Sequence, residues 1–229
     1  MSDSSFYKIL NSINVNPLQV LDLEFEHGEY VHLDLSETNL KLTAVNVSAS
    51  DSLGLYINTY LKQYHGKVGY GGYLEVRDLY KRSTYFNSED KVTERNIHLG
   101  IDLWCDAGTS VLAVLKGTVH SFRNNTNYGD YGPTIILKHA VSNVEFYTLY
   151  GHLSLESISK LKVGQMVAQG QKIGDLGTSK INGDYPPHLH FQIIKDIQTY
   201  SGDYPGVCSP LDLEFYRVNC PDPNVLLKI

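Results

Sequence analysis

The stretch PPHLHFQI, residues 186–193, carries two histidines that are one residue apart, His188 and His190. This stretch predicts a strand, in which side chains two positions apart point to the same face. Two imidazoles on one face can supply two nitrogen ligands to a metal ion, or one ligand and one catalytic base. An isolated His-x-His is more often a hydrogen-bonded structural pair, so its meaning depends on what the rest of the chain offers.

A second cluster, IHLGIDLW at residues 97–104, lies about 90 residues upstream. Its His98 and Asp102 would be about 13 Å apart on a straight strand, too far to share a metal that binds its ligands at about 2 Å. We therefore expect the chain to bend at Gly100, where a bend costs little. The pair, with one histidine of the downstream pair, then forms the kind of three-ligand set that catalytic zinc uses while keeping a fourth position for water.

A further histidine, His152, follows a strand and a glycine in YTLYGHLS, residues 147–154. Near a metal, such a histidine can accept the proton of an attacking water or stabilise an oxyanion. The remaining histidines lack a partner motif and are interpreted as structural or surface residues: His27, His32, His65, His120 and His139.

Composition and patterning favour a fold that is mainly β. The chain has 17 Tyr among 229 residues, and short β-rich runs separated by Gly, Asn and Asp begin near residue 95. Glycine-punctuated segments at 107–119 and 162–177 resemble the two halves of a barrel-sandwich fold. We expect a barrel-sandwich catalytic domain over 91–229 with a loop-rich tail, and a small α+β extension over 1–90 that packs on it.

Charge and cysteine content bound the remaining function classes. The net charge of −6 and the absence of a basic run argue against nucleic-acid binding, and no apolar run approaches the ~18 residues of a membrane span. The first residues do not resemble a signal peptide, which predicts a cytoplasmic protein, or a cell-envelope protein if the chain is truncated or exported by another route. Cys105, Cys208 and Cys220 fit free thiols in a reducing compartment, with a Cys208–Cys220 bridge as the alternative.

The motifs HLGID, GHLS and HLH, in this order, resemble the lysostaphin/LytM-type zinc metallopeptidases, which are of the peptidoglycan endopeptidase type. The pattern Gly-x-x-Val-x-x-Gly-x-x-Ile-Gly at 164–174 is similar to the same family, and the resemblance covers residues 95–195. It implies a lysostaphin-like duplicated hybrid motif. No family position is substituted, and the resemblance implies zinc ligands at His98, Asp102 and His190 and catalytic histidines at His152 and His188.

Five longer runs resemble a peptidase-like domain found inside some large aminotransferase fusion proteins. They are GGYLEVRDLY, ERNIHLGIDLW, DYGPTIILKH, GDYPGVC and CPDPN. They extend the resemblance over most of the chain, including much of the N-terminal third and the tail.

Together, the residues and the resemblance predict a zinc metalloendopeptidase with one Zn²⁺. Its substrate would be peptide bonds in peptidoglycan cross-links or in peptidoglycan-derived peptides, hydrolysed by metal-activated water. One alternative is a zinc-bound, non-catalytic regulatory or binding module, whose cleft the Gly- and Tyr-rich residues 68–86 could plug as irregular surface chain. The other is a histidine phosphocarrier of similar β architecture, against which Asp102 argues because that chemistry needs no carboxylate ligand. The sequence does not predict the oligomeric state.

Overall fold

The structure is a computed structural model that describes residues 3–13, 16–23, 29–84, 86 and 88–229. Its strands are β1 (Tyr30–His32), β2 (Val68–Gly71), β3 (Ile97–His98), β4 (Ile101–Trp104), β5 (Ser110–Leu112), β6 (Gly117–Asn125), β7 (Gly132–Val141), β8 (Val144–Gly151), β9 (Met166–Val167), β10 (Lys172–Asp175), β11 (His188–Ile194) and β12 (Val207–Cys208). Its helices are α1 (Asp3–Ile13), α2 (Ser50–Gln63), α3 (Leu155–Ser159), α4 (Leu213–Asn219) and α5 (Asn224–Leu227), with 3₁₀ turns η2 (Leu40–Ala44), η3 (Asp78–Arg82) and η4 (Pro210–Asp212).

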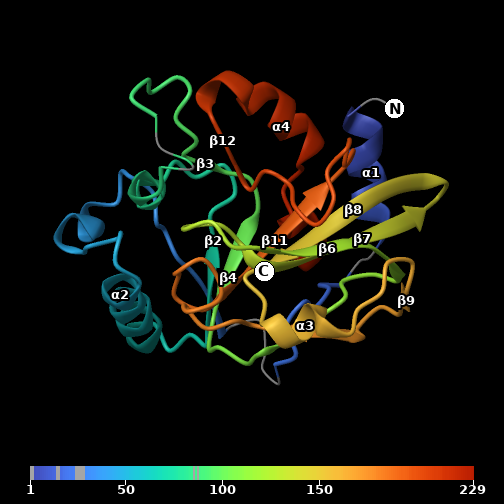
Figure 1. The fold of residues 1–229 in the computed structure, drawn as a ribbon, viewed down its shortest axis with the longest axis horizontal. Coiled ribbons are helices and arrows are strands. Elements are labelled where there is room, and N and C mark those ends of the chain that lie inside the picture. The colour runs from blue at the N-terminus through green and yellow to red at the C-terminus, as the bar shows by residue number, and fades with distance from the viewer. Residues whose placement is uncertain (1–2, 14–15, 24–28, 85, 87) are drawn as a thin grey trace.

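A large mixed sheet forms the centre of the molecule, in the strand order β1-β2-β4-β11-β8-β7-β6-β9 (Figure 1). Only the β1–β2 pair within it is parallel. Two further sheets of two strands each, β10–β5 and β12–β3, lie beside it. The prediction of a mainly β fold is confirmed, and the large sheet does not close into a barrel within the residues that the structure describes.

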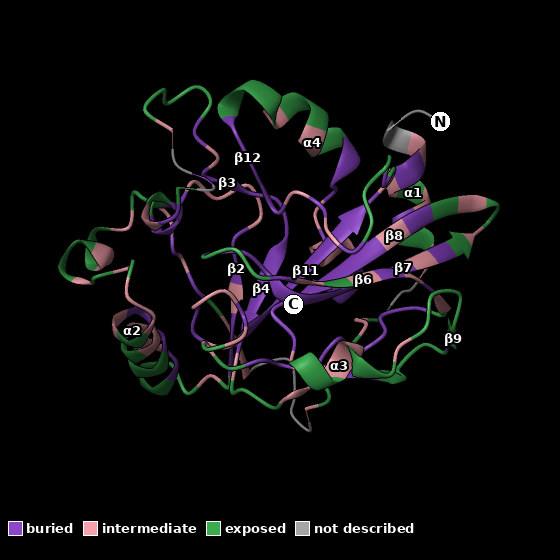
Figure 2. Cartoon of the chain, viewed as in Figure 1, coloured by how far each residue is buried: buried purple, intermediate pink, exposed green. Residues whose placement is uncertain are grey.

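Strand β11 lies at the middle of the core because it is covered on both faces. All seven of its residues are buried, and it pairs antiparallel with β4 on one side and with β8 on the other (Figure 2). Apolar residues of β11 therefore face two hydrophobic clusters, with Phe191 in one and Ile194 in the other. A strand buried in this way gives side chains very little freedom, which makes it a rigid support for a site.

The hairpin that joins β7 to β8 follows from local sequence. Ser142 and Asn143 both have positive φ, 50° and 61°, between the paired residues Val141 and Val144. A two-residue loop with positive φ at both positions matches the right-handed twist of the strands it connects. The register of β8 is set at this turn, and it brings Gly151, at the far end of β8, next to His190 of β11.

The N-terminal third is joined to the sheet by hydrogen bonds. Strand β2 pairs with β4, so residues 68–71 are a buried inner strand and not the irregular surface chain that the glycines predicted. Glycine is favoured there because the sheet is crowded: a Cβ at Gly69 would lie 3.3 Å from Leu33. The domain boundary near residue 90 stays a prediction.

The C-terminal tail contains the short helices α4 and α5, whereas its Pro- and Asp-rich composition predicted loops. In α4, Leu213 and Tyr216 are three residues apart and pack together on the cluster that contains Tyr204 and Cys220. The prediction of a loop was wrong here because two helical turns, flanked by proline, give too short a period to recognise. None of the helices in the described part of the chain is long and apolar enough to cross a membrane.

Candidate metal centre

The pairing of β4 with β11 brings the two sequence clusters together. Asp102 lies opposite His190, and Trp104 lies opposite His188. Residues on paired strands that face the same side of a sheet have side chains in contact. His98 ends β3, which pairs with β12, and the chain changes sheets between His98 and Ile101 before β4 begins.

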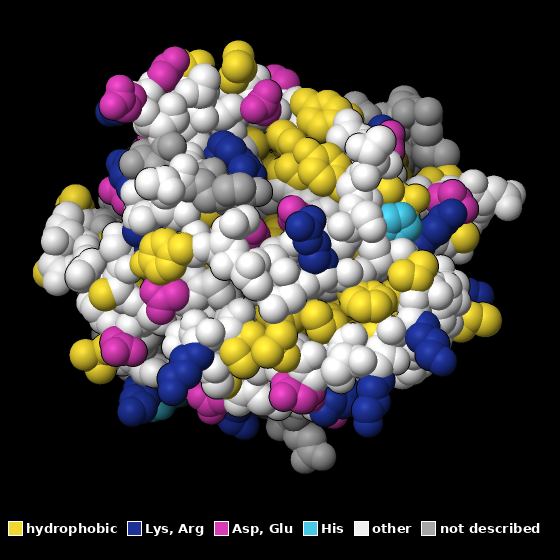
Figure 3. Space-filling model, viewed as in Figure 1, with side chains coloured by type: hydrophobic (Ala, Val, Ile, Leu, Met, Phe, Trp, Pro, Cys, Tyr) yellow, Lys and Arg dark blue, Asp and Glu magenta, His cyan; other side chains and the backbone are white. Residues whose placement is uncertain are grey.

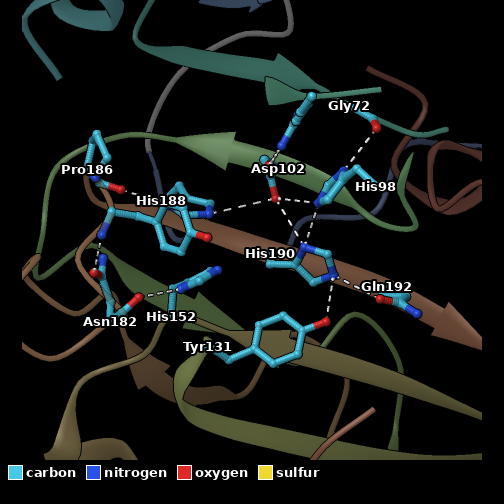
Figure 4. A network of polar contacts seen from close by, with 12 residues as sticks. Gly72, His98, Asp102, Tyr131, His152, Asn182, Pro186, His188, His190 and Gln192 are labelled. Carbon is cyan, nitrogen blue, oxygen red and sulfur yellow. Dashed lines mark hydrogen bonds and ion pairs between the residues drawn. The ribbon is translucent and has the colours of Figure 1, made fainter. Parts of the chain in front are cut away.

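This break in the strand places His98 beside Asp102, as the sequence predicted. The nitrogen Nε2 of His98 lies 3.2 Å from Oδ1 of Asp102 and 2.8 Å from Nδ1 of His190, which itself lies 3.2 Å from the same Oδ1 (Figure 4). All three side chains are buried. Tetrahedral ligands at 2.0–2.1 Å from zinc would be about 3.3 Å apart, so these atoms need to move only slightly to hold such an ion.

Gly100 is needed for space. A Cβ at this position would lie 2.6 Å from Cε1 and Nε2 of His190, and 2.8 Å from the carbonyl oxygen of Phe191. Such distances are well inside van der Waals contact, which begins near 3.5 Å for carbon atoms. The glycine therefore lets the His98–Asp102 turn lie directly against the imidazole of His190.

Hydrogen bonds to oxygen acceptors set which nitrogen of each ligand imidazole faces the cluster. Nδ1 of His98 donates to the carbonyl oxygen of Gly72 at 2.9 Å, and Nε2 of His190 donates to Oε1 of Gln192 at 2.9 Å. The amide of Gln192 is itself oriented, because its Nε2 donates to the carbonyl oxygen of Pro205. Each bond leaves a ring nitrogen without a proton on the opposite side, facing Asp102.

Three electron-pair acceptors therefore face one another in a buried space. Burial lowers the pKa of His98 to about 4, so its imidazole is neutral at pH 7. Burial by itself would raise the pKa of Asp102, but His98 and Arg77 outweigh it and hold that pKa well below its usual range. Two imidazole nitrogens and a carboxylate oxygen that converge in this way are a donor set that fits a divalent cation such as zinc.

His152 and His188 lie beside this set with their rings 4.1 Å apart between centroids. Each Nδ1 donates to a backbone carbonyl at 2.8 Å, His152 to Asn182 and His188 to Pro186, so each Nε2 is left as an acceptor (Figure 4). His188 stacks on Trp104 with centroids 3.9 Å apart, and its Nε2 lies 3.8 Å from Oδ1 of Asp102.

The two rings are held neutral by their surroundings. Burial lowers the pKa of His188 to about 4, and burial together with the neighbouring His188 lowers the pKa of His152 well below its usual value. The backbone at His152 has φ of 63°, a left-handed conformation that is uncommon for a residue other than glycine. That strained turn, directly after β8, aims the imidazole back toward β11.

All five residues line one cleft of about 310 Å³. Its walls come from distant parts of the chain and include Tyr80 and Phe86 from the first 90 residues, Tyr131 just before β7, and Tyr204 near the tail. On the face shown in Figure 3, basic and acidic side chains are interspersed, and hydrophobic side chains gather near α4, where Phe215 is 49% exposed.

Several residues of the site carried no signal in the sequence. Arg77 donates to Oδ2 of Asp102 across 25 residues, and the hydroxyl of Tyr131 lies 3.4 Å from Nε2 of His190. Nothing local marks either one. Gln192 could have been found, because it follows His190 by two positions on the same strand face.

The other histidines lie apart from the cluster or outside the described residues. His139 is buried and bonded to the carbonyl oxygen of Lys116 and the hydroxyl of Thr148, a structural role, whereas His32 and His65 are exposed and His120 is half-buried. His27 lies outside the described residues. Cys105, Cys208 and Cys220 are all free thiols, so the structure contains no Cys208–Cys220 bridge.

Comparison with known proteins relates the central part of the chain to peptidases. Residues 96–201 match the family described as Peptidase family M23. An L-Ala--D-Glu endopeptidase of Bacillus subtilis is 26% identical over 187 residues, which are 76% of this chain and 55% of that protein. The peptidoglycan DD-endopeptidase ShyC of Vibrio cholerae is 35% identical over 98 residues, 42% of this chain and 20% of its own length.

Among solved structures, the catalytic domain of lysostaphin from Staphylococcus simulans is 28% identical, with a TM-score of 0.38, and the match covers 53% of this chain and 80% of that domain. The chain spans 55% and 20% of the length of the two curated relatives. The resemblance to a domain of aminotransferase fusion proteins stays a prediction.

Proposed function

We propose that the chain, of which residues 96–201 match the family described as Peptidase family M23, is a zinc-dependent metalloendopeptidase. Its proposed substrates are peptide bonds in peptidoglycan or in peptides derived from it, in keeping with the endopeptidase relatives. His98, Asp102 and His190 are the proposed zinc ligands, and His152 and His188 the proposed catalytic residues.

The observation that carries the proposal is the convergence of three acceptors without a donor. Nε2 of His98, Nδ1 of His190 and Oδ1 of Asp102 lie within 3.2 Å of one another, and both rings have their protons committed elsewhere. A cation bound between them would satisfy all three acceptors at once in a buried space, where an unpaired polar group is costly. A divalent ion bound there would polarise a peptide carbonyl and make a water a better nucleophile at neutral pH.

The protein's own groups supply the proton transfers. His152 and His188, both neutral at pH 7, present Nε2 acceptors that can take the proton of the attacking water. Once protonated, the same nitrogen becomes a donor toward the developing oxyanion or the leaving amine. We assign the first step to His188, because its Nε2 lies 3.8 Å from the carboxylate of Asp102, which would stabilise the imidazolium.

The direct test is incubation of the purified, zinc-loaded chain with peptidoglycan and with soluble muropeptides, followed by mass spectrometry. We expect products that differ from the substrate by one water at a peptide bond. His152→Ala should keep the metal and lose turnover, since this ring is not among the ligands. His65→Asn is the matched control, because His65 is exposed and has a positive φ, which asparagine tolerates.

The possible outcomes distinguish an active peptidase from a metal-bound module without activity and from a chain without a metal site. A chain that binds zinc but cleaves neither substrate would be a metal-bound module without activity, and the peptidase assignment would be wrong. A chain that binds no divalent metal when purified without chelator would remove the metal centre as well. Activity retained in His152→Ala would leave His188 as the only catalytic histidine of the pair.

A further inference from the structure

A short segment before the M23 domain reaches into the candidate metal centre. Residues 72–77 lie between β2 and η3, outside the matched residues 96–201. The guanidinium of Arg77 is 1% exposed and donates through Nη1 to Oδ2 of Asp102 at 2.5 Å, and through Nε to Oε2 of Glu75 at 2.5 Å. A buried arginine thus contacts a proposed zinc ligand directly.

The two carboxylate oxygens of Asp102 have different partners, because Arg77 binds only one of them. Oδ2 is taken by Arg77, whereas Oδ1 lies 3.2 Å from each of the facing nitrogens of His98 and His190. A carboxylate held in this way can offer a metal one oxygen only. Without the arginine, the group could rotate and offer both oxygens to the ion, which would change the coordination number.

Gly72, five residues before Arg77, holds a second proposed ligand. Its carbonyl oxygen accepts from Nδ1 of His98 at 2.9 Å, which leaves Nε2 for the metal. The position has φ of 103°, and a Cβ there would overlap Nη2 of Arg77 and lie 2.8 Å from Nδ1 of His98. Only glycine allows the carbonyl, the imidazole and the guanidinium to pack together here.

The charge of Arg77 is balanced within the same segment. Glu75 contacts Arg77 through Oε2 and accepts from the backbone N–H of Leu35 through Oε1 at 3.0 Å. Leu35 follows β1 by three residues, so the N-terminal part of the chain fixes Glu75, Glu75 fixes Arg77, and Arg77 fixes Asp102. Buried charges are tolerated when they are paired and hydrogen-bonded in this way.

We propose that residues 72–77 are part of the metal centre, with Arg77 as the positioning residue that makes Asp102 a one-oxygen ligand and Gly72 as the residue that orients His98. This inference rests on the proposed zinc site. The catalytic centre then depends on chain that precedes the family domain. Residues that hold metal ligands commonly contribute 10- to 100-fold to affinity, about the effect expected here.

The test compares the unaltered 229-residue chain with its Arg77→Lys and Arg77→Met variants. Zinc affinity is measured by competition with a chromogenic chelator, and the cobalt-substituted protein is examined by visible absorption. We expect affinity to fall by about 10- to 100-fold in both variants. We also expect weaker cobalt absorption in Arg77→Met, because higher coordination numbers absorb less than four-coordinate cobalt. Lys81→Met is the matched control, since Lys81 lies in η3 and forms an exposed ion pair with Asp78.

The two proposals fail in different ways. Wild-type protein that binds neither zinc nor cobalt would overturn the proposed function. Wild-type binding with an unchanged affinity and cobalt spectrum in both Arg77 variants would overturn the role of Arg77 and leave the zinc site standing. If Arg77→Met does not fold, the same two measurements on Arg77→Lys and Glu75→Gln decide whether Arg77 positions Asp102. The lysine keeps the charge but cannot bridge Glu75 and Asp102 as a guanidinium does.

Discussion

Replacing Gly100 by alanine tests the position of His190 without removing any proposed ligand. The added Cβ would lie 2.6 Å from two atoms of the His190 ring and 2.8 Å from the carbonyl oxygen of Phe191. Carbon atoms normally approach to about 3.5–4.0 Å, so the ring or the turn must move by about 1 Å. Neither has room to move, because His190 is 2% exposed and Phe191 is 0% exposed.

A displacement of this size exceeds what a metal site tolerates. Ligand distances in such sites vary by about 0.2 Å, so a shift of about 1 Å removes His190 from the ion. We expect zinc affinity to fall by at least about 100-fold, the upper end of the effect of disturbing a group that holds a ligand. Overpacking should cost about 1–3 kcal/mol of unfolding free energy. For a chain of this length that corresponds to a melting temperature lower by about 2–12 °C.

The assay is chelator competition for zinc, with thermal melting of the metal-free protein beside it. Gly54→Ala is the matched control, because a Cβ there meets Pro186 at 3.6 Å, an ordinary contact, inside helix α2. Alanine favours a helix over glycine by about 1 kcal/mol, so this variant should keep its affinity and melt no lower. Wild-type zinc affinity in Gly100→Ala would refute the placement of His190 as a ligand.

Three further predictions concern the stability that zinc adds, the role of Gln192 and the pH dependence of folding. Free zinc at about 100 times its dissociation constant should stabilise the protein by about 2.7 kcal/mol, or about 5–11 °C in calorimetry, and Asp102→Asn should abolish the effect. Gln192→Leu should weaken zinc binding by about 10- to 100-fold in titration calorimetry, because it removes the acceptor that orients His190, and unchanged affinity would contradict this role. Burial lowers the pKa of His139 to about 4, against about 6.5 in the unfolded chain. The unfolded chain therefore binds more protons, and the metal-free protein loses stability as the pH falls from about 6.5 to about 4. In urea titrations, His139→Gln should reduce that slope by up to about 1.4 kcal/mol per pH unit, and equal slopes would contradict this.

The sequence by itself determined the chemistry of the donor set and the strand that carries it. Imidazole and carboxylate are metal ligands by residue type, and the alternation in HLH places His188 and His190 on one face wherever the strand lies. The break between His98 and Asp102 was predictable for the same local reason, since four residues of straight strand cannot bring both to one ion. The roles of His98, Asp102 and His190 as zinc ligands, and those of His152 and His188 in catalysis, stay predictions. The domain boundary and the cellular location stay predictions as well.

Only the tertiary structure decided which atoms converge at the proposed metal site and what holds them there. The choice of Nε2 in His98 depends on a carbonyl 26 residues away, and the orientation of Asp102 depends on Arg77, 25 residues away. Such contacts join strands that are neighbours only after the sheet has formed, so no local pattern encodes them. The glycines of residues 68–86 predicted a surface chain, because the sequence does not show which strand they pack against. In the folded protein they let buried backbone pack beside the site. Residue types therefore predicted the donor set, and long-range packing determined its geometry.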